Sequence, residues 1–336
     1  MLTISLGIDV AKDKLDVALY QADKYKLACF SNDKDGWRRL TRWLKKQKAK
    51  GVHVCLEATG RYGEGVAWYL HQHGYPVSVV NPARIKAYAQ SQLQRNKTDR
   101  QDAQVIAHFC ATQNPDLWTP PAPEIQELQA LVRRLETLKA SRTRELNRQQ
   151  SGLTSQTVLD AIEEHITFLN TQIADIEQRI RDLIDQHPDL REQKELLTSI
   201  PGIGDITAAT FLAEVPDVSR FETAAQLAAY AGLTPRRHDS GSSIHRRGRL
   251  VKIGNSRFRT ALYFPALTAM RHNPIACALV ARLEARGKKR MTIVGAVMRK
   301  LVHLAFGVLK HQRPFDPDYL VNVHGTALLS TRYLCG

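Results

Sequence analysis

The first third of the chain alternates strand-like and helix-like segments, and this pattern constrains the fold more than any other feature. Residues 2–9 and 15–20 alternate apolar and polar side chains, which predicts two strands joined by the polar turn Ala11–Lys14. The segments that follow are a helical pattern at Trp37, Leu40, Trp43 and Leu44, an apolar run over 52–56, a helical pattern over 63–73 and a strand-like run over 75–80. We therefore expect a mixed α/β sheet covered by helices on its faces.

A proline-rich segment ends this α/β pattern. Three prolines, Pro120, Pro121 and Pro123, fall within four positions after Trp118, and such a segment can continue neither a helix nor a central strand. We predict a catalytic α/β domain over 1–117, a linker with two long helices over 118–190, a mainly helical domain over 191–320 and a loosely ordered tail over 321–336.

The segment after the prolines carries a long helical repeat. Apolar residues recur at alternating gaps of four and three at Ile162, Ile166, Leu169, Ile173, Ile176, Ile180 and Leu183. This spacing is typical of a coiled-coil seam, and it predicts that two long helices pair, within one chain or between two. An ordinary helical hairpin buried against the rest of the protein explains the stripe equally well.

The charge of the chain favours a polyanionic partner. Lysine and arginine number 48 against 33 acidic residues, which gives a net charge of +15. Nucleic acid is favoured over a membrane surface because no uninterrupted apolar run approaches the roughly 20 residues of a spanning helix. The N-terminal residues also lack the features of a secretory leader, so we expect a cytoplasmic protein that is associated with the nucleoid when it binds DNA.

Two acidic residues stand at the ends of predicted strands. Asp9 ends the run Leu6-Gly-Ile-Asp9, and Glu57 ends the run over 52–57. Acids at the ends of strands in one sheet can face the same crevice, where α/β sheets usually bind their ligands. Taken one at a time, such acids more often contact solvent or cap helices.

A second pair of acids opens a predicted helix. Asp99 and Asp102 are three residues apart, which places both carboxylates on one helical face. Clustered carboxylates need a compensating cation, and their oxygens suit Mg²⁺ or Mn²⁺ in a site for phosphate chemistry. The alternative for Asp99 is a helix N-cap or a first-turn acid that stabilises the helix dipole.

A glycine-rich turn lies at the start of the C-terminal segment. Pro201-Gly-Ile-Gly204 precedes a helix of small residues, as in a helix-hairpin-helix, where backbone N–H groups near Gly202 and Gly204 bind a DNA phosphate. A glycine turn that only packs two helices together is the simpler alternative.

The basic residues concentrate around a serine-rich segment. The run includes Arg236, Arg237, Arg246, Arg247, Arg249, Lys252, Arg257 and Arg259. This density indicates contact with a phosphate backbone. The segment over 238–243 reads as a polar loop in which Ser240 could attack a phosphoryl group, although the residues alone favour a flexible loop whose serines only form hydrogen bonds.

Taken together, five ordered motifs resemble a known family over nearly the whole chain. They are Gly7-Ile-Asp-Val-Ala-Lys12, Glu57-Ala-Thr-Gly60, Asn96-Lys-Thr-Asp-Arg-Gln-Asp-Ala103, Pro201-Gly-Ile-Gly204, and Ala231-Gly-Leu-Thr-Pro-Arg236 through Ser240-Gly-Ser-Ser243. The chain resembles the DEDD transposases of insertion sequences related to the Piv invertase.

The resemblance implies a fold and a set of catalytic residues. It implies a RuvC-like N-terminal domain with an RNase H type fold, in which Asp9, Glu57, Asp99 and Asp102 bind Mg²⁺. It also implies that Ser240 attacks DNA to form a phosphoserine link, with Ser242 and Ser243 as nearby alternatives. Lys97, in the same motif as Asp99, is expected to contact nucleic acid together with the glycine turn and the arginines.

The resemblance further implies the partners of the protein. Family members act on donor and target DNA under the guidance of a structured bridge RNA, and they form dimers that pair into tetramers, for which the heptad stripe is a plausible interface. Two other classes fit the residues less completely. One is a RuvC-like Holliday-junction resolvase or nuclease that acts by hydrolysis, and the other is a non-catalytic nucleic-acid-binding protein.

Overall fold

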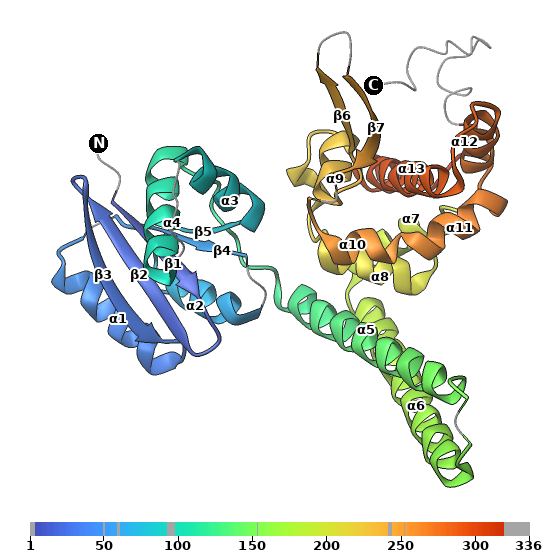
Figure 1. Cartoon of the computed structure of the whole chain (residues 1–336), viewed down its shortest axis with the longest axis horizontal. Helices are drawn as coiled ribbons and strands as arrows, with labels where there is room; N and C mark the ends of the chain where they lie inside the picture. Colours follow the sequence, from blue (N-terminus) through green and yellow to red (C-terminus); the bar gives the residue numbers. More distant parts are fainter. Residues whose placement is uncertain are drawn as a thin grey trace. The chain divides into compact units, whose positions relative to one another are not determined.

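The chain folds into two compact units. The computed structural model describes residues 4–49, 51–58, 61–92, 98–152, 154–240, 244–251 and 253–318. The units are Met1–Pro120 and Pro121–Gly336, and each has its own hydrophobic core (Figure 1).

The first unit is built on a five-stranded mixed sheet with the strand order β3-β2-β1-β4-β5. The strands are β1 (Ser5–Val10), β2 (Lys14–Gln21), β3 (Lys24–Ser31), β4 (His53–Glu57) and β5 (Val77–Val80). Strands β1, β2 and β3 are antiparallel, whereas β4 and β5 run parallel to β1. The predicted mixed sheet and its opening hairpin are therefore confirmed. Strand β3, an edge strand that is mostly exposed, was not predicted from the sequence.

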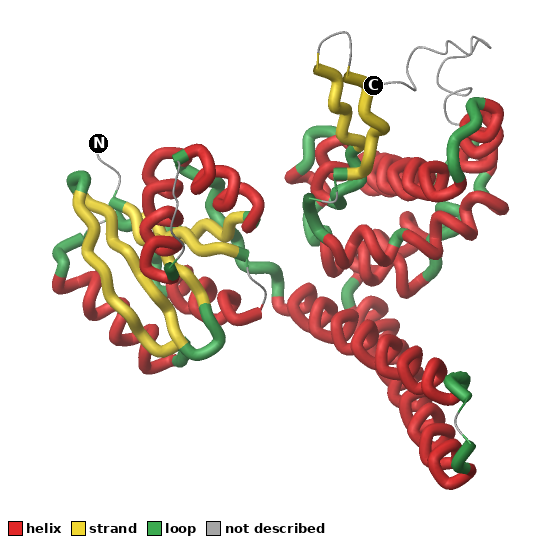
Figure 2. Tube along the Cα trace, in the orientation of Figure 1, coloured by secondary structure: helices red, strands yellow, loops and turns green. Residues whose placement is uncertain are grey.

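Helices cover both faces of this sheet (Figure 2). On one face, α1 (Lys34–Lys46) and α2 (Arg61–Gln72) pack against Leu6, Ile8 and Val10 of β1. On the other face lies α4 (Asp99–Gln113), with α3 (Pro82–Ser91) beside it. Because side chains alternate along a strand, Ser5, Gly7 and Asp9 face α4.

The second unit is mainly helical. Its elements are α5 (Pro123–Gln149), α6 (Gln156–Gln186), α7 (Pro188–Thr198), α8 (Asp205–Glu214), η1 (Val218–Arg220), α9 (Ala224–Tyr230), β6 (Pro235–Ser240), β7 (Ile244–Leu250), α10 (Ser256–Ala261), α11 (Tyr263–His272), α12 (Pro274–Ala285) and α13 (Arg290–His311). One hydrophobic core runs from Ile125 of α5 to Leu309 of α13. The two long helices and the C-terminal helices, which the sequence pattern assigns to separate segments, thus share a core.

The two long helices pair within the chain. Helices α5 and α6 pack along each other as a hairpin (Figure 1). Of the heptad positions, Leu169, Ile173 and Ile180 are buried. Ile184, outside the repeat, is also buried, whereas Leu183 is half-buried. The stripe is therefore covered only in part by the chain's own helices.

The basic segment of the second unit forms a β-ribbon. Strands β6 and β7 pair antiparallel, so Ser240 is the last residue of a strand. The expectation of a loop over 238–243 was wrong for residues 238–240, while 241–243 lie outside the described residues. These strands were not predicted from the sequence, because β6 and β7 consist mainly of charged and polar residues.

Helix α13 is the most apolar long helix of the described residues. By length and composition alone it could cross a membrane, but 61% of its most apolar stretch is buried inside the second unit. This degree of burial is what a core helix of a globular unit shows.

Candidate active site

A close contact between α4 and β1 positions the acidic residues. A Cβ atom added to Gly7 would lie 2.2 Å from the carbonyl oxygen of Ala103 and 2.3 Å from the backbone nitrogen of Ala107. The Ser5 hydroxyl donates a hydrogen bond of 2.7 Å to the Ala107 carbonyl oxygen. Only glycine permits this approach, so the helix that begins with Asp99 lies directly on the strand that ends near Asp9.

The sheet register aligns acidic residues across adjacent strands. Asp9 of β1 lies opposite Asp16 of β2. The parallel pairing of β1 with β4 ends at Ile8 and Leu56, so Asp9 and Glu57 are the next residues on the two strands. Aligned residues on neighbouring strands point to the same face. Asp16, Asp9 and Glu57 therefore all lie on the face covered by α4.

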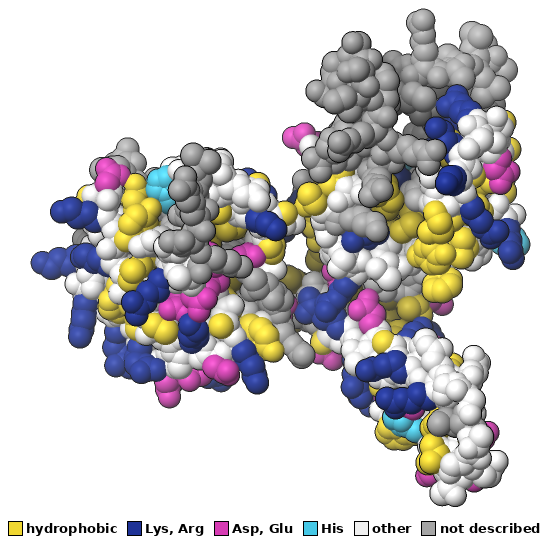
Figure 3. Space-filling view, in the orientation of Figure 1, with side chains coloured by type: hydrophobic (Ala, Val, Ile, Leu, Met, Phe, Trp, Pro, Cys, Tyr) yellow, Lys and Arg dark blue, Asp and Glu magenta, His cyan; other side chains and the backbone are white. Residues whose placement is uncertain are grey.

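The first turn of α4 supplies the other two carboxylates. The Thr98 hydroxyl caps the helix by accepting a hydrogen bond of 3.3 Å from the backbone N–H of Gln101. Asp99 is therefore a first-turn acid and not the N-cap. Asp102 follows one turn later on the same helical face. In Figure 3, acidic side chains gather on this unit beside lysine and arginine side chains.

The electrostatics of Asp9 show that these acids lie close together. Burial of the carboxyl group, followed by the negative charges of Asp102, Asp99, Glu57 and Asp16, raises the pKa of Asp9 from 3.8 to about 6. The four acids predicted from the sequence thus act on one another in the folded unit. A carboxyl group with a strongly raised pKa beside specific charged partners is a candidate functional group.

Sequence reasoning missed two members of this cluster, Asp16 and Lys14. Asp16 is only 6% exposed. The Nζ atom of Lys14 lies 2.6 Å from Asp99 Oδ2 and 2.9 Å from Asp16 Oδ2. Hydrogen bonds to these two carboxylates raise the pKa of Lys14. The antiparallel pairing of the hairpin was the signal that could have identified Asp16, since it places Asp16 opposite Asp9.

The donor set of this cluster suits a hard divalent cation. It consists of carboxylate oxygens, the ligands that Mg²⁺ prefers, and the mutual repulsion recorded in the raised pKa of Asp9 is relieved by added positive charge. Within the described residues, no three acidic, histidine or cysteine side chains already converge as a metal site. Lys14 supplies part of the positive charge in this arrangement.

The β-ribbon carries the predicted serine and arginines of the second unit. Its register places Arg236 opposite Arg249, and His238 opposite Arg246. Gly241–Ser243 and Lys252 lie outside the described residues, as do Lys97 and Thr59–Gly60 of the first unit.

The glycine turn joins α7 to α8 and is packed on one side. Gly202 has a φ of +107°, and a Cβ there would lie 2.8 Å from the Cβ of Ala269 and 2.9 Å from the Pro265 carbonyl oxygen. Gly204 is the N-cap of α8, and a Cβ there would meet no atom within 4 Å. Gly202 is thus needed for the turn and for its packing against α11. Gly204 leaves the start of α8 accessible, although Asp205 adds a negative charge in its first turn.

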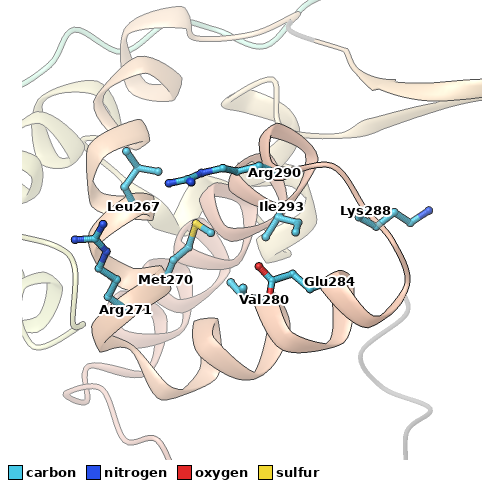
Figure 4. Close-up of a pocket in the computed structure, with 8 residues that line it drawn as sticks. All are labelled: Leu267, Met270, Arg271, Val280, Glu284, Lys288, Arg290 and Ile293. Carbon is cyan, nitrogen blue, oxygen red and sulfur yellow. The ribbon is translucent and has the colours of Figure 1, made fainter.

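A separate cavity of about 390 Å³ lies between α11, α12 and α13 (Figure 4). Its lining is apolar at Leu267, Met270, Val280 and Ile293 and charged at Arg271, Glu284, Lys288 and Arg290. In Figure 4 the Lys288 side chain extends away from the other lining residues. The cavity holds one carboxylate beside its cations and lacks the clustered acids of the first unit.

Comparison with known protein families gives matches to both units. The DEDD IS110 model, described as "Transposase", matches residues 6–157, and the model of the "Transposase IS116/IS110/IS902 family" matches residues 194–281. The two matches together contain every residue that the sequence patterns identify as a site candidate.

Similarity to individual proteins extends over nearly the whole chain. The chain is 36% identical over 314 residues to the pilin gene-inverting protein of Moraxella bovis, covering 93% of this chain and 97% of the relative. The pilin gene-inverting protein of Moraxella lacunata matches at the same identity and coverage. The transposase for insertion sequence element IS1111A of Coxiella burnetii is 26% identical over 348 residues, covering 92% of this chain and 90% of the relative. The chain therefore belongs to the IS116/IS110/IS902 transposase family, a family of insertion-sequence transposases and DNA-inverting enzymes.

Proposed function

We propose that this protein is a transposase that cleaves and exchanges DNA strands with the help of Mg²⁺, for which Mn²⁺ can substitute, bound by Asp9, Glu57, Asp99 and Asp102. The observation that carries the proposal is the set of carboxylates around Asp9: burial of Asp9, together with the negative charges of these neighbours, raises its pKa to about 6. Two separate features of the fold place these acids near one another. The strand register aligns Asp9 with Glu57, and the contact at Gly7 holds α4, with Asp99 and Asp102, against β1. Such a concentration of negative charge is costly in a protein without a cationic ligand.

The residues of the first unit would hold and orient the scissile phosphate. A bound divalent cation would polarise the phosphoryl oxygens and stabilise the charge that develops on the leaving oxygen. Asp9 would hold the cation from the sheet, and Asp99 and Asp102 would hold it from α4. Lys14, whose ammonium group contacts Asp99 and Asp16, would offset part of the negative charge of these two carboxylates until a cation binds.

The covalent step is assigned to Ser240 at the end of β6. The serine oxygen attacks phosphorus, a P–Oγ bond forms, and the bond to the 3′ oxygen breaks, so that the 3′ hydroxyl leaves with a proton and the 5′ side stays on the serine. A 3′ hydroxyl of the second duplex then attacks this phosphoserine and releases the serine. The link retains the bond energy, so exchange needs no other energy source.

The nucleic-acid partners proposed are donor and target DNA and a structured bridge RNA. The net charge of +15 and the opposed arginines of the ribbon support binding to phosphate backbones. Lys97, Gly202 and Gly204, together with Arg236, Arg237, Arg246, Arg247 and Arg249, are the proposed contacts. The proposal predicts that a defined RNA encoded beside the gene copurifies with the protein and is required for exchange.

The proposed assembly is a homodimer that pairs into a tetramer. Helix α6 supports an interface, since Ile166 and Ile176 of the stripe are half-buried and Phe168, on another face of the same helix, is 59% exposed. Light scattering coupled to gel filtration would test this assembly. Replacement of Phe168 by glutamate should shift the protein to a smaller species, and an unchanged mass would remove α6 from the interface.

The decisive experiment for the chemistry is the capture of a protein–DNA adduct that resists denaturation. The Ser240→Ala variant should form no adduct while it binds DNA as tightly as the unaltered protein, whereas Ser242→Ala and Ser243→Ala should retain the adduct. Loss in one of the other variants would move the nucleophile to that serine. Cleavage without an adduct in the unaltered protein would favour hydrolysis by a resolvase-like nuclease.

A further inference from the structure

Helix α13 carries a group of basic side chains that belongs to neither the carboxylate cluster nor the β-ribbon. Arg299 lies one helical turn before His303, and Lys300 lies three residues before it, so both basic residues neighbour His303 on the helix surface. All are half-buried, although much of the same helix is in the core. The spacing therefore brings the positive charges together on the partly covered face of a core helix.

The face of α13 that carries these basic residues lies next to the end of β7 and next to α12. One turn before Arg299, a Cβ added to Gly295 would lie 3.0 Å from Leu250 Cδ1 at the end of β7. Helix α12 packs along α13 and carries Arg282, whose charge acts on Lys300. Further along, a Cβ added to Gly307 would meet no atom within 4 Å, so the face is open there. The basic group thus lies beside the base of the β-ribbon and beside α12.

Two polar atoms of this group are buried without a hydrogen-bond partner. They are Nη1 of Arg299 and Nε2 of His303. Nothing in the described parts of the chain pairs with Arg299 or Lys300 as a salt bridge. An arginine nitrogen that loses water and gains no partner is costly, because the desolvation of a charge is then uncompensated.

The surrounding charges increase this cost. Burial, followed by the positive charges of Arg299 and Lys300, lowers the pKa of His303 from 6.5 to about 4. Burial, followed by the charge of Arg282, lowers the pKa of Lys300. Burial alone lowers the pKa of Arg299. The charges that act on these groups are all positive, and no carboxylate among the described residues offsets them.

The described acids on the elements packed against α13 are all engaged or turned to solvent. Asp189, Glu192 and Glu195 of α7 are exposed, Glu284 of α12 lines the cavity described above, and the carboxylate of Asp217 beside η1 is bound by Ser219 and Arg220. In the sequence, residues 319–336 contain no aspartate or glutamate, and residues 236–249 contain only Asp239. The compensating negative charge is therefore expected from a ligand.

We infer that the face of α13 formed by Arg299, Lys300 and His303 is a binding site for a phosphate group of a nucleic-acid backbone. The planar guanidinium of Arg299 suits two phosphate oxygens, and the ammonium of Lys300 adds a compact charge on the other side of His303. An anion bound beside His303 would raise the pKa of its imidazole and offset the charges of Arg299 and Lys300. The inference depends on the proposed function only where it names nucleic acid as the source of the phosphate. The chemistry of the three side chains suits any phosphodiester.

The first test measures equilibrium binding with the full chain in the absence of divalent metal. Fluorescence anisotropy over a salt series is recorded with duplex DNA, single-stranded DNA and a structured RNA of equal length. The Arg299→Gln variant should lower affinity about tenfold, because a charged hydrogen bond is lost. It should also make the slope of log K against log salt concentration less steep, by about 0.9 for duplex DNA or about 0.7 for a single strand, because one phosphate contact is lost. The nucleic acid that shows this change is the source of the phosphate.

Two variants of the same helix serve as controls. Lys310 is exposed on α13, so Lys310→Gln removes an equal charge outside the buried group and should change affinity much less. Arg299→Lys keeps the charge and should restore most of the salt dependence. Equal losses for Arg299→Gln and Lys310→Gln with all three nucleic acids would overturn the inference, because they would indicate a general surface field.

The second test uses sodium tripolyphosphate as a probe and does not depend on nucleic acid. It should raise the melting temperature of the unaltered protein more than that of an Arg299→Gln/His303→Gln variant. Without the probe, the variant should be at least as stable, since it removes an uncompensated charge, and this result also shows that it folds. Equal shifts in both proteins would contradict the site. Neither test involves strand exchange, so their failure leaves the proposed function standing.

Discussion

Asp9 of β1 lies directly opposite Asp16 of β2 in the antiparallel register, so two acids occupy one cross-strand pair. Like charges in this position destabilise a sheet. Lys14 offsets part of the repulsion through its contact of 2.9 Å with Asp16. The negative charge that remains is felt at Asp9, whose pKa is about 6. The hairpin thus holds an excess of negative charge that a divalent cation would stabilise.

The repulsion at Asp9 should appear in the stability of the protein. Between pH 3.8 and about 6 the folded protein holds a proton on Asp9 that the unfolded chain has released, so stability falls as the pH rises through this window. Above it, Asp9→Asn should raise the free energy of unfolding by about 1–3 kcal/mol without metal. Urea unfolding at pH 8 and pH 3.5 would measure this, with a gain at the higher pH only.

The exposed turn acid Asp13 provides the control for that measurement. The Asp13→Asn variant removes the same charge from the hairpin turn outside the cluster and should leave unfolding nearly unchanged at both pH values. A similar gain from both variants would attribute the effect to net charge and not to the cluster.

Magnesium should bind and stabilise the folded protein. At pH 8 and a Mg²⁺ concentration of 100 times the dissociation constant, the free energy of unfolding should rise by about 2.7 kcal/mol. The effect should weaken below about pH 6, where Asp9 takes up a proton that competes with the metal. Thermal unfolding with and without Mg²⁺ would measure it, and Asp9→Asn should abolish the shift. A shift that survives in this variant would place the metal elsewhere.

Lys14 should compete with the metal for Asp99. Its ammonium group lies 2.6 Å from Asp99 Oδ2, so a cation that binds this oxygen must displace it. The Lys14→Gln variant should therefore bind Mg²⁺ several-fold more tightly in calorimetric titrations. The adjacent exposed Lys12 supplies the control, because Lys12→Gln should not change the affinity to the same extent. Weaker binding in Lys14→Gln would show that Lys14 organises the carboxylates for the metal.

The contact at Gly7 should be essential for the placement of α4. Alanine there would put its Cβ 2.2 Å from the Ala103 carbonyl oxygen, a backbone atom that cannot move alone. Gly7→Ala should destabilise the protein by about 1–3 kcal/mol or more through overpacking. Gly307→Ala, where a Cβ meets no atom within 4 Å, should stabilise α13 slightly. Chemical denaturation would compare the two, and a neutral Gly7→Ala would contradict the close approach.

Local patterns in the sequence predicted the elements that carry the first site. Apolar alternation located β1 and β2, and the spacing of Asp99 and Asp102 at a helix start predicted their common face. These features depend on neighbouring residues, which a sequence displays directly. The strands β3, β6 and β7 were missed, since β3 is mostly exposed and β6 and β7 consist mainly of charged and polar residues.

The sequence by itself determined which chemical groups this protein has: the acids at strand ends and in the first turn of α4, the arginine run, and the motifs of its family. Only the tertiary structure decided which of them meet. Asp16 joined the cluster through strand register, Lys14 through its reach to Asp99, and the basic group of α13 through burial without a counter-charge. Register and helix docking are set by the packing of whole cores, so contacts between residues distant in the chain arise from the folded unit and not from any local pattern.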